Sequence, residues 1–123
     1  MPPGGASGDA VRLEIRYNAT CALAHRGSKR FGPDHVEILG EMLDEQQQLK
    51  NFRVKMDNKQ EYADVPTARL TVDAALKASA ELKKQRTDLD LQPLYDAIAT
   101  LTGSEDKFIR RRALETQKEL GLK

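Results

Sequence analysis

The sequence predicts an all-α fold, an antiparallel three-helix bundle that is rod-shaped and similar to a spectrin repeat. The 123 residues include no Trp, three Phe and three Tyr, which is little aromatic material for a compact β core, and residues that favour helices dominate. Apolar residues recur at helical spacing in three segments. We therefore expect a flexible tail at 1–8 and one domain at 9–121, with helices at about 9–57, 64–102 and 104–120.

The first predicted helix follows a seam of mostly apolar side chains spaced alternately four and three residues apart. The seam positions are Tyr17, Cys21, Ala24, Ser28, Phe31, His35, Ile38, Met42, Glu45, Leu49, Phe52 and Met56. Asp9 is a suitable N-cap, and the polar segment 57–60 ends the helix. Gly27, Gly32 and Pro33 interrupt it. Because the seam keeps its phase across Pro33, we expect a kinked helix; the alternative is that Gly32 and Pro33 begin a new one.

A competing interpretation is that two parts of this helix are strands, because apolar and polar residues alternate there. The alternating apolar residues are Val11, Leu13, Ile15 and Tyr17 in one part, and Phe52, Val54 and Met56 in the other. Two strands alone are marginally stable, and no third strand is predicted. We therefore favour the helical interpretation.

The second and third predicted helices have clear start signals and apolar stripes. The second begins at Asp64 and Pro66, and its stripe is Val65, Ala68, Val72, Ala75, Ser79, Leu82, Arg86 and Leu89, continued by Leu91, Leu94, Ile98 and Leu101. The stripe changes phase at Pro93, so we expect a bend there, about level with Pro33. The third begins with Ser104 as its cap, and its inner face is Ile109, Ala113, Thr116 and Leu120.

The residues offer little for catalysis. Cys21 and His25 are four apart and share a helix face, as a nucleophile and its base would, but no orienting acid accompanies them. We interpret both as structural residues. The sequence contains no metal-binding or nucleotide-binding motif. It therefore predicts a protein that is not an enzyme and has no catalytic residues, cofactor or metal.

The overall charge is nearly balanced, with 20 Lys and Arg against 19 Asp and Glu, so no global field attracts nucleic acid or membranes. A single Cys favours a reducing compartment, and neither a signal-peptide pattern nor a long apolar run is apparent. We expect a cytoplasmic protein without nucleic-acid or membrane partners. Sequence leaves open whether it is a monomer or a homodimer.

Charge is unevenly distributed along the chain. Residues 10–33 contain five basic residues and one acid, whereas residues 34–49 contain five acids and neither Lys nor Arg. The densest basic cluster is Lys107 with Arg110, Arg111 and Arg112. Acids interleave with this cluster and no aromatic residues suited to base stacking accompany it, so an acidic protein surface is a better partner than RNA.

Four segments resemble the tubulin-binding cofactor A family. They are VRLEIRYNA at 11–19, DNKQEY at 57–62, LDLQ at 89–92 and GSEDKFIRRRALE at 103–115. The resemblance implies a rod-like three-helix bundle that binds β-tubulin during folding and heterodimer assembly. It further implies a chaperone associated with the cytoskeleton that uses no cofactor.

Basic and aromatic residues are our candidates for the protein contact. They are Arg12, Arg16, Arg26, Lys29, Arg30, Tyr62, Phe108, Arg110 and Arg111. Two alternative functions remain: a generic helical adaptor for another cytosolic protein, and a small RNA-associated protein that uses the Arg110–Arg112 cluster.

Overall fold

A computed structural model describes residues 8–122, which are mostly helical. The helices are α1 (Gly8–His25), α2 (Pro33–Met42), α3 (Glu45–Asn51), α4 (Val65–Gln85), α5 (Gln92–Leu101) and α6 (Lys107–Leu120). Two short strands, β1 (Arg53–Lys55) and β2 (Glu61–Ala63), form an antiparallel hairpin between α3 and α4. The all-α class is therefore confirmed for the described residues. Residues 1–7 of the expected tail lie outside them, and Gly8 already belongs to α1.

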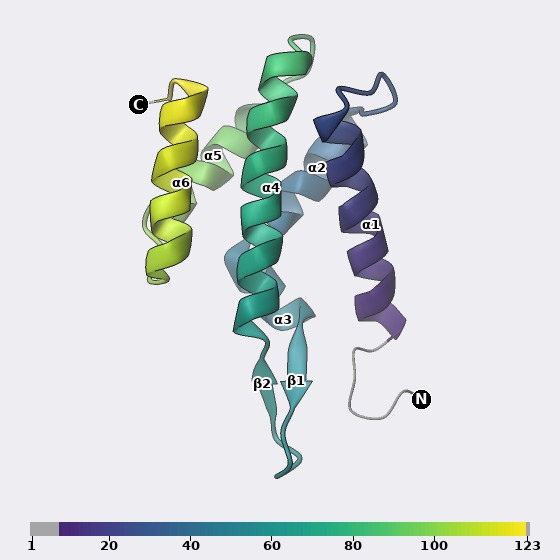
Figure 1. Cartoon of the computed structure of the whole chain (residues 1–123), viewed down its shortest axis with the longest axis vertical. Coiled ribbons are helices and arrows are strands. Elements are labelled where there is room, and N and C mark those ends of the chain that lie inside the picture. The colour runs from purple at the N-terminus through teal and green to yellow at the C-terminus, as the bar shows by residue number, and fades with distance from the viewer. Residues whose placement is uncertain (1–7, 123) are drawn as a thin grey trace.

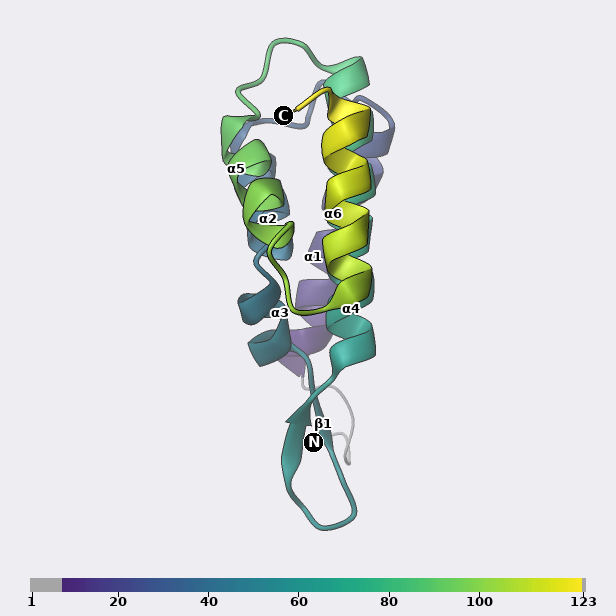
Figure 2. The same ribbon diagram turned by 90° about the vertical axis from the view of Figure 1, so that its left-hand side faces the viewer.

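The helices are arranged in two layers (Figures 1 and 2). α1, α4 and α6 stand side by side in one layer and run in the same direction, with α4 in the middle. α2, α3 and α5 form the second layer, in which α2 and α5 run in the opposite direction. The hairpin projects from one end of the molecule, and the loops at 26–32 and 86–91 lie at the other end. This arrangement has more helices than the three that we expected.

The expected helix at 9–57 is wrong as a single element, because the chain reverses direction at 26–32. Gly27 ends α1 in a left-handed conformation with φ of 60°, and the N–H of Ser28 donates to the carbonyl of Leu23 at 3.1 Å, as in a Schellman motif. Pro33 is the first residue of α2, where its missing N–H costs nothing. The alternative in which Gly32 and Pro33 begin a new helix is therefore confirmed.

The expected helix at 64–102 is likewise two helices, α4 and α5, which are joined by a reversal at 86–91. Pro93 lies in the first turn of α5, so it starts a helix and does not bend one. The Arg86 guanidinium donates to the carbonyls of Ser28 and Phe31, at 2.5 and 2.9 Å. These bonds join the two reversals at one end of the molecule.

The hairpin shows that the strand interpretation was partly right. Val54 pairs with Tyr62 across the two strands, and the turn is closed by Lys59, whose φ is 66°. The alternation at residues 52–56 therefore indicated a real strand, and the second strand follows the polar segment 57–60 that we expected to end the helix. The alternation at residues 11–17 did not, since those residues belong to α1.

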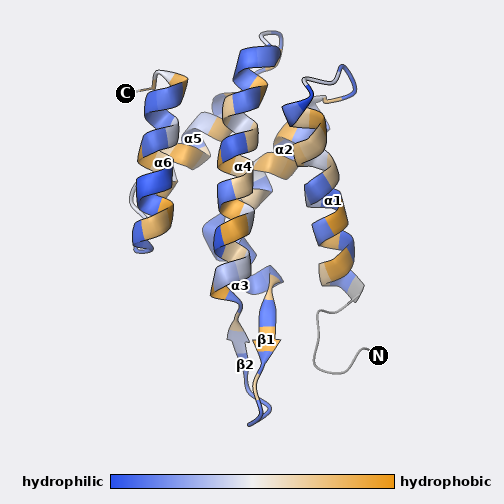
Figure 3. Cartoon of the chain, in the orientation of Figure 1, coloured by the Kyte–Doolittle hydropathy of each residue, from blue (hydrophilic) through white to orange (hydrophobic). Residues whose placement is uncertain are grey.

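The core lies between the two layers and is formed largely by the predicted seams. The buried seam residues are Tyr17, Ala24, Phe31, Met42, Phe52, Ala68, Val72, Ala75, Ser79, Leu82, Leu91, Leu94, Ile98, Leu101, Ile109, Ala113, Thr116 and Leu120. Met56 and Val65 depart from the prediction, because they are 53% and 41% exposed. Figure 3 shows the resulting alternation of hydrophobic and hydrophilic residues along α4 and α6.

The third helix forms near its predicted position but begins later. Asp106 is its N-cap, and its carboxylate accepts from the N–H groups of Phe108 and Ile109 at 2.9 and 3.1 Å. Ser104, the predicted cap, instead accepts from the N–H of Asp106 at 3.0 Å. An acidic cap is favoured at this position, where it also complements the helix dipole.

Gly40 lies inside α2, where Gly costs about 1 kcal/mol relative to Ala. A Cβ built at Gly40 would meet nothing within 4 Å. Packing within the chain therefore does not explain why a glycine occupies this position.

Candidate protein-binding surface

The five basic residues predicted in the first segment are all exposed, on α1 and in the loop that follows it, and we call this set the basic strip. It consists of Arg12, Arg16, Arg26, Lys29 and Arg30. The first two lie one turn apart on α1, and the other three lie in the loop that follows α1. None of the five forms an ion pair within residues 8–122. Their charges are thus available to a partner.

Two aliphatic side chains lie beside the basic strip on α1. Val11 is 49% exposed and Ile15 is 64% exposed, and their spacing of four places them on one face of the helix next to Arg12 and Arg16. A surface that combines cations with aliphatic groups is suited to another protein.

The loop that carries three of the five residues of the basic strip is anchored to the body of the molecule. Phe31 is fully buried at its end, and Gln85 donates to the carbonyl of His25 at 2.5 Å. A Cβ on Gly27 would lie 2.5 Å from Gln85 Oε1, so only glycine permits this close approach. Lys29 and Arg30 are therefore presented from a well-packed loop.

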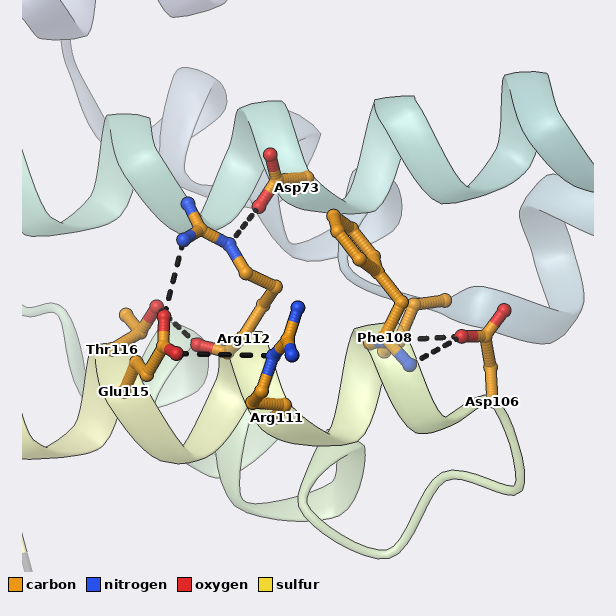
Figure 4. A network of polar contacts seen from close by, with 8 residues as sticks. Asp73, Asp106, Phe108, Arg111, Arg112, Glu115 and Thr116 are labelled. Atoms are coloured by element: carbon orange, nitrogen blue, oxygen red, sulfur yellow. Dashed lines mark hydrogen bonds and ion pairs between the residues drawn. The ribbon is translucent and has the colours of Figure 1, made fainter.

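The second basic cluster is engaged within the molecule, as Figure 4 shows. Arg112 donates to Asp73 of α4 at 2.8 Å and to Glu115 at 3.1 Å, and these acids raise the pKa of its guanidinium further. Arg110 donates to the carbonyl of Ser104 at 3.1 Å, and Arg111 lies 3.9 Å from Glu115. Only Arg111 among the three arginines is well exposed, which disfavours the cluster as an RNA site.

The two aromatic candidates lie apart from the basic strip. Phe108 is partly buried, and the guanidinium of Arg69 lies 5.8 Å from its ring centroid, so its role includes joining α6 to α4. Tyr62 is 46% exposed on the hairpin, at the opposite end of the molecule from the loop at 26–32. Five of the nine candidates therefore lie on α1 and the loop that follows it, and the other four lie on the hairpin and α6.

A concentration of acids in the second layer is the main feature that sequence reasoning missed. Residues 33–51 and 88–106, which include α2, α3 and α5, contain ten of the 19 acids and one Lys. Every other Lys and Arg lies outside these two segments. The acidic run at 34–49 was visible in the sequence, but only the fold places the second segment beside it.

Cys21 is packed and is not set up as a nucleophile. Its thiol lies 4.0 Å from the Met42 sulfur, and burial raises the pKa of the thiol to about 11. His25 is exposed at the end of α1. The interpretation of Cys21 as a structural residue agrees with this geometry, because a reactive cysteine needs a lowered pKa.

We predict that the Cys21 thiol reacts slowly with thiol reagents in the folded protein. At pH 8 the native protein should react with an aromatic disulfide reagent about a hundredfold more slowly than the chain unfolded in urea, because far less thiolate is present. Absorbance of the released thiolate measures both rates. Equal rates in the two states would show that the thiol is not buried in solution.

Fold and surface together define a small two-layer helical domain that presents an exposed basic strip. Within residues 8–122 there is no group of three or more His, Cys, Asp or Glu placed to hold a metal ion, and no helix there has the length and apolar character to cross a membrane. Comparisons with protein-family models, with curated proteins and with solved structures gave no match.

Proposed function

We propose that this chain is a non-catalytic module that binds an acidic surface of another protein through its basic strip. In line with the sequence resemblance, we propose β-tubulin as that partner, bound during tubulin folding and heterodimer assembly in the cytoplasm. The observation that carries the proposal is the set of five exposed cations, none of which forms an ion pair with another residue of the described range 8–122. The resemblance also implies a rod-shaped three-helix bundle, whereas the described residues form six helices and support only its all-α class.

The composition of the strip favours a protein partner over nucleic acid. Val11 and Ile15 offer aliphatic contact area beside the cations, and apolar area at the centre of an interface contributes most of the affinity. The cations set the rate and the orientation of binding. Arg112, by contrast, is committed to Asp73 and Glu115.

Charge reversal in the strip tests the proposal. We expect the wild-type chain to co-elute with β-tubulin at low micromolar concentration and modest salt. The triple variant Arg26→Glu, Lys29→Glu, Arg30→Glu should bind about 30-fold more weakly, because attraction becomes repulsion. Size exclusion detects the co-elution, and fluorescence titration measures the affinities of the wild-type chain and the triple variant.

A matched control reverses exposed cations outside the strip. Lys55→Glu with Lys59→Glu changes the hairpin and should alter the affinity by less than about threefold. If the wild-type chain does not co-elute with β-tubulin, the assignment of the partner is wrong. If another acidic cytosolic protein binds with the same dependence on the strip, the adaptor function replaces the tubulin function.

A further inference from the structure

A cleft lies in the acidic layer, away from the basic strip. It has a volume of about 660 Å³ and lies between the α2–α3 region on one side and α5 with the loop to α6 on the other. This volume is within the range of sites that bind small molecules or peptide side chains. The hydroxyl of Ser104 donates to Glu45 at 2.7 Å, so a direct bond between the α5–α6 loop and α3 fixes one edge.

The floor of the cleft is aliphatic. It includes Leu43, Leu49, Ala97 and Leu101, of which Leu49 and Ala97 are partly exposed. Gly40 also lines the cleft, and the space above its Cα is empty. Gly40 therefore leaves room above the helix for an aliphatic side chain of a ligand, whereas a bulky side chain at this position would fill that space.

The rim of the cleft is acidic. Asp44, Glu45 and Glu105 line it, and none of the described lining residues is Lys or Arg. Segments 33–51 and 88–106 carry ten acids against one Lys, and within the described residues only two of these acids, Asp88 and Asp106, form ion pairs with arginines outside the segments. The remaining excess of negative charge attracts cations and repels acidic partners. The aliphatic floor and the acidic rim together favour an occupant that has both basic and apolar side chains.

We propose that this cleft binds a short basic segment of a partner protein. An aliphatic side chain of the segment fills the space over Gly40, and flanking Lys or Arg side chains pair with the carboxylates of the rim. This inference goes beyond the proposed function, because no residue of the basic strip lines the cleft and the strip is proposed to recognise an acidic surface. The chain then bridges two partners of opposite charge.

A synthetic peptide of alternating Lys and Leu is the probe for this cleft. Fluorescence anisotropy should detect its binding to the full chain, and amide resonances of Gly40, Ala97 and Gly103 should shift in nitrogen-labelled protein. The same peptide with Glu in place of Lys should not bind. A peptide with Ser in place of Leu should bind about fivefold more weakly, because it leaves the floor uncovered.

Variants of the cleft separate specific binding from general attraction. Gly40→Leu fills the space over the floor and should weaken binding at least about tenfold, while Gly40→Ala should change it less than about threefold. Glu105→Lys should weaken binding about fivefold. Glu37→Lys, in the same acidic layer but outside the lining, is the matched control and should change it less than about twofold.

Three outcomes would overturn the proposal. The first is peptide binding that shifts no lining residue, and the second is an equal effect of Glu37→Lys and Glu105→Lys. The third is self-association of the wild-type chain that Gly40→Leu abolishes, because the occupant would then be a second copy. Sedimentation of each variant without peptide detects that case. Loss of tubulin binding in the strip variants has no bearing on these measurements, so the two proposals fail independently.

Discussion

Phe31→Ala is expected to lower the free energy of unfolding by about 3–5 kcal/mol, which is the usual cost of removing a fully buried Phe side chain. Phe31 has no solvent exposure, although it lies in the loop between α1 and α2 and not in a helix. Its carbonyl also accepts from Arg86 at 2.9 Å. Its ring therefore anchors the reversal that separates the two layers.

Urea denaturation followed by circular dichroism measures this change. Leu70→Ala is the control, because Leu70 is 67% exposed and its truncation should change the stability by no more than about 0.5 kcal/mol. A loss below about 1 kcal/mol for Phe31→Ala would mean that the ring is not packed in solution.

Tyr17→Phe is expected to cost about 1–3 kcal/mol, because it removes three hydrogen bonds that a partly buried hydroxyl makes between helices. The Tyr17 hydroxyl donates to Glu41 at 2.7 Å and accepts from the amides of Gln48 and Asn51, at 3.2 and 3.3 Å. Gln48 is fully buried. One hydroxyl thus joins α1, α2 and α3. Tyr62→Phe on the exposed hairpin should have little effect, and equal losses in the two variants would contradict this role.

Tyr17 is also expected to make the stability of the folded protein depend on pH in the alkaline range. Burial, followed by the bond and charge of Glu41, raises the pKa of Tyr17 above its ordinary value of 10.0. The folded state therefore holds the proton more tightly than the unfolded chain does, so this stabilisation is full below pH 10 and is lost as pH rises further. Stability measured above pH 10 in a Cys21→Ala background should fall more steeply with Tyr17 than with Tyr17→Phe. Equal slopes would refute the coupling.

The inward faces of the helices could be predicted because they depend on spacing within each helix. Ile109, Ala113, Thr116 and Leu120 are all buried as expected, since residues three and four apart share a helix face wherever the helix lies. The seam from Tyr17 to Phe52 also faces inward for most of its length, even though it belongs to three helices and a reversal.

The direction of the chain could not be predicted from the same spacing. A Pro inside a helix and a Pro in its first turn look alike in the sequence, and at Pro33 the second case holds. The reversal depends on Gly27 adopting a positive φ against Gln85, about 60 residues away in the chain, and on Arg86 reaching the loop. These contacts are not local, so no window of sequence contains them.

The candidate surfaces likewise include features that the sequence predicts and features that only the tertiary structure shows. Sequence alone determined the helical class, the inward faces and the basic segment at 10–33, because helix periodicity and local charge are properties of neighbouring residues. Only the tertiary structure decided that Arg110 and Arg112 are engaged internally and that residues 33–51 and 88–106 share one acidic layer around a cleft. Those features arise when distant segments pack together, and the pairing of segments is set by the whole core rather than by any one of them.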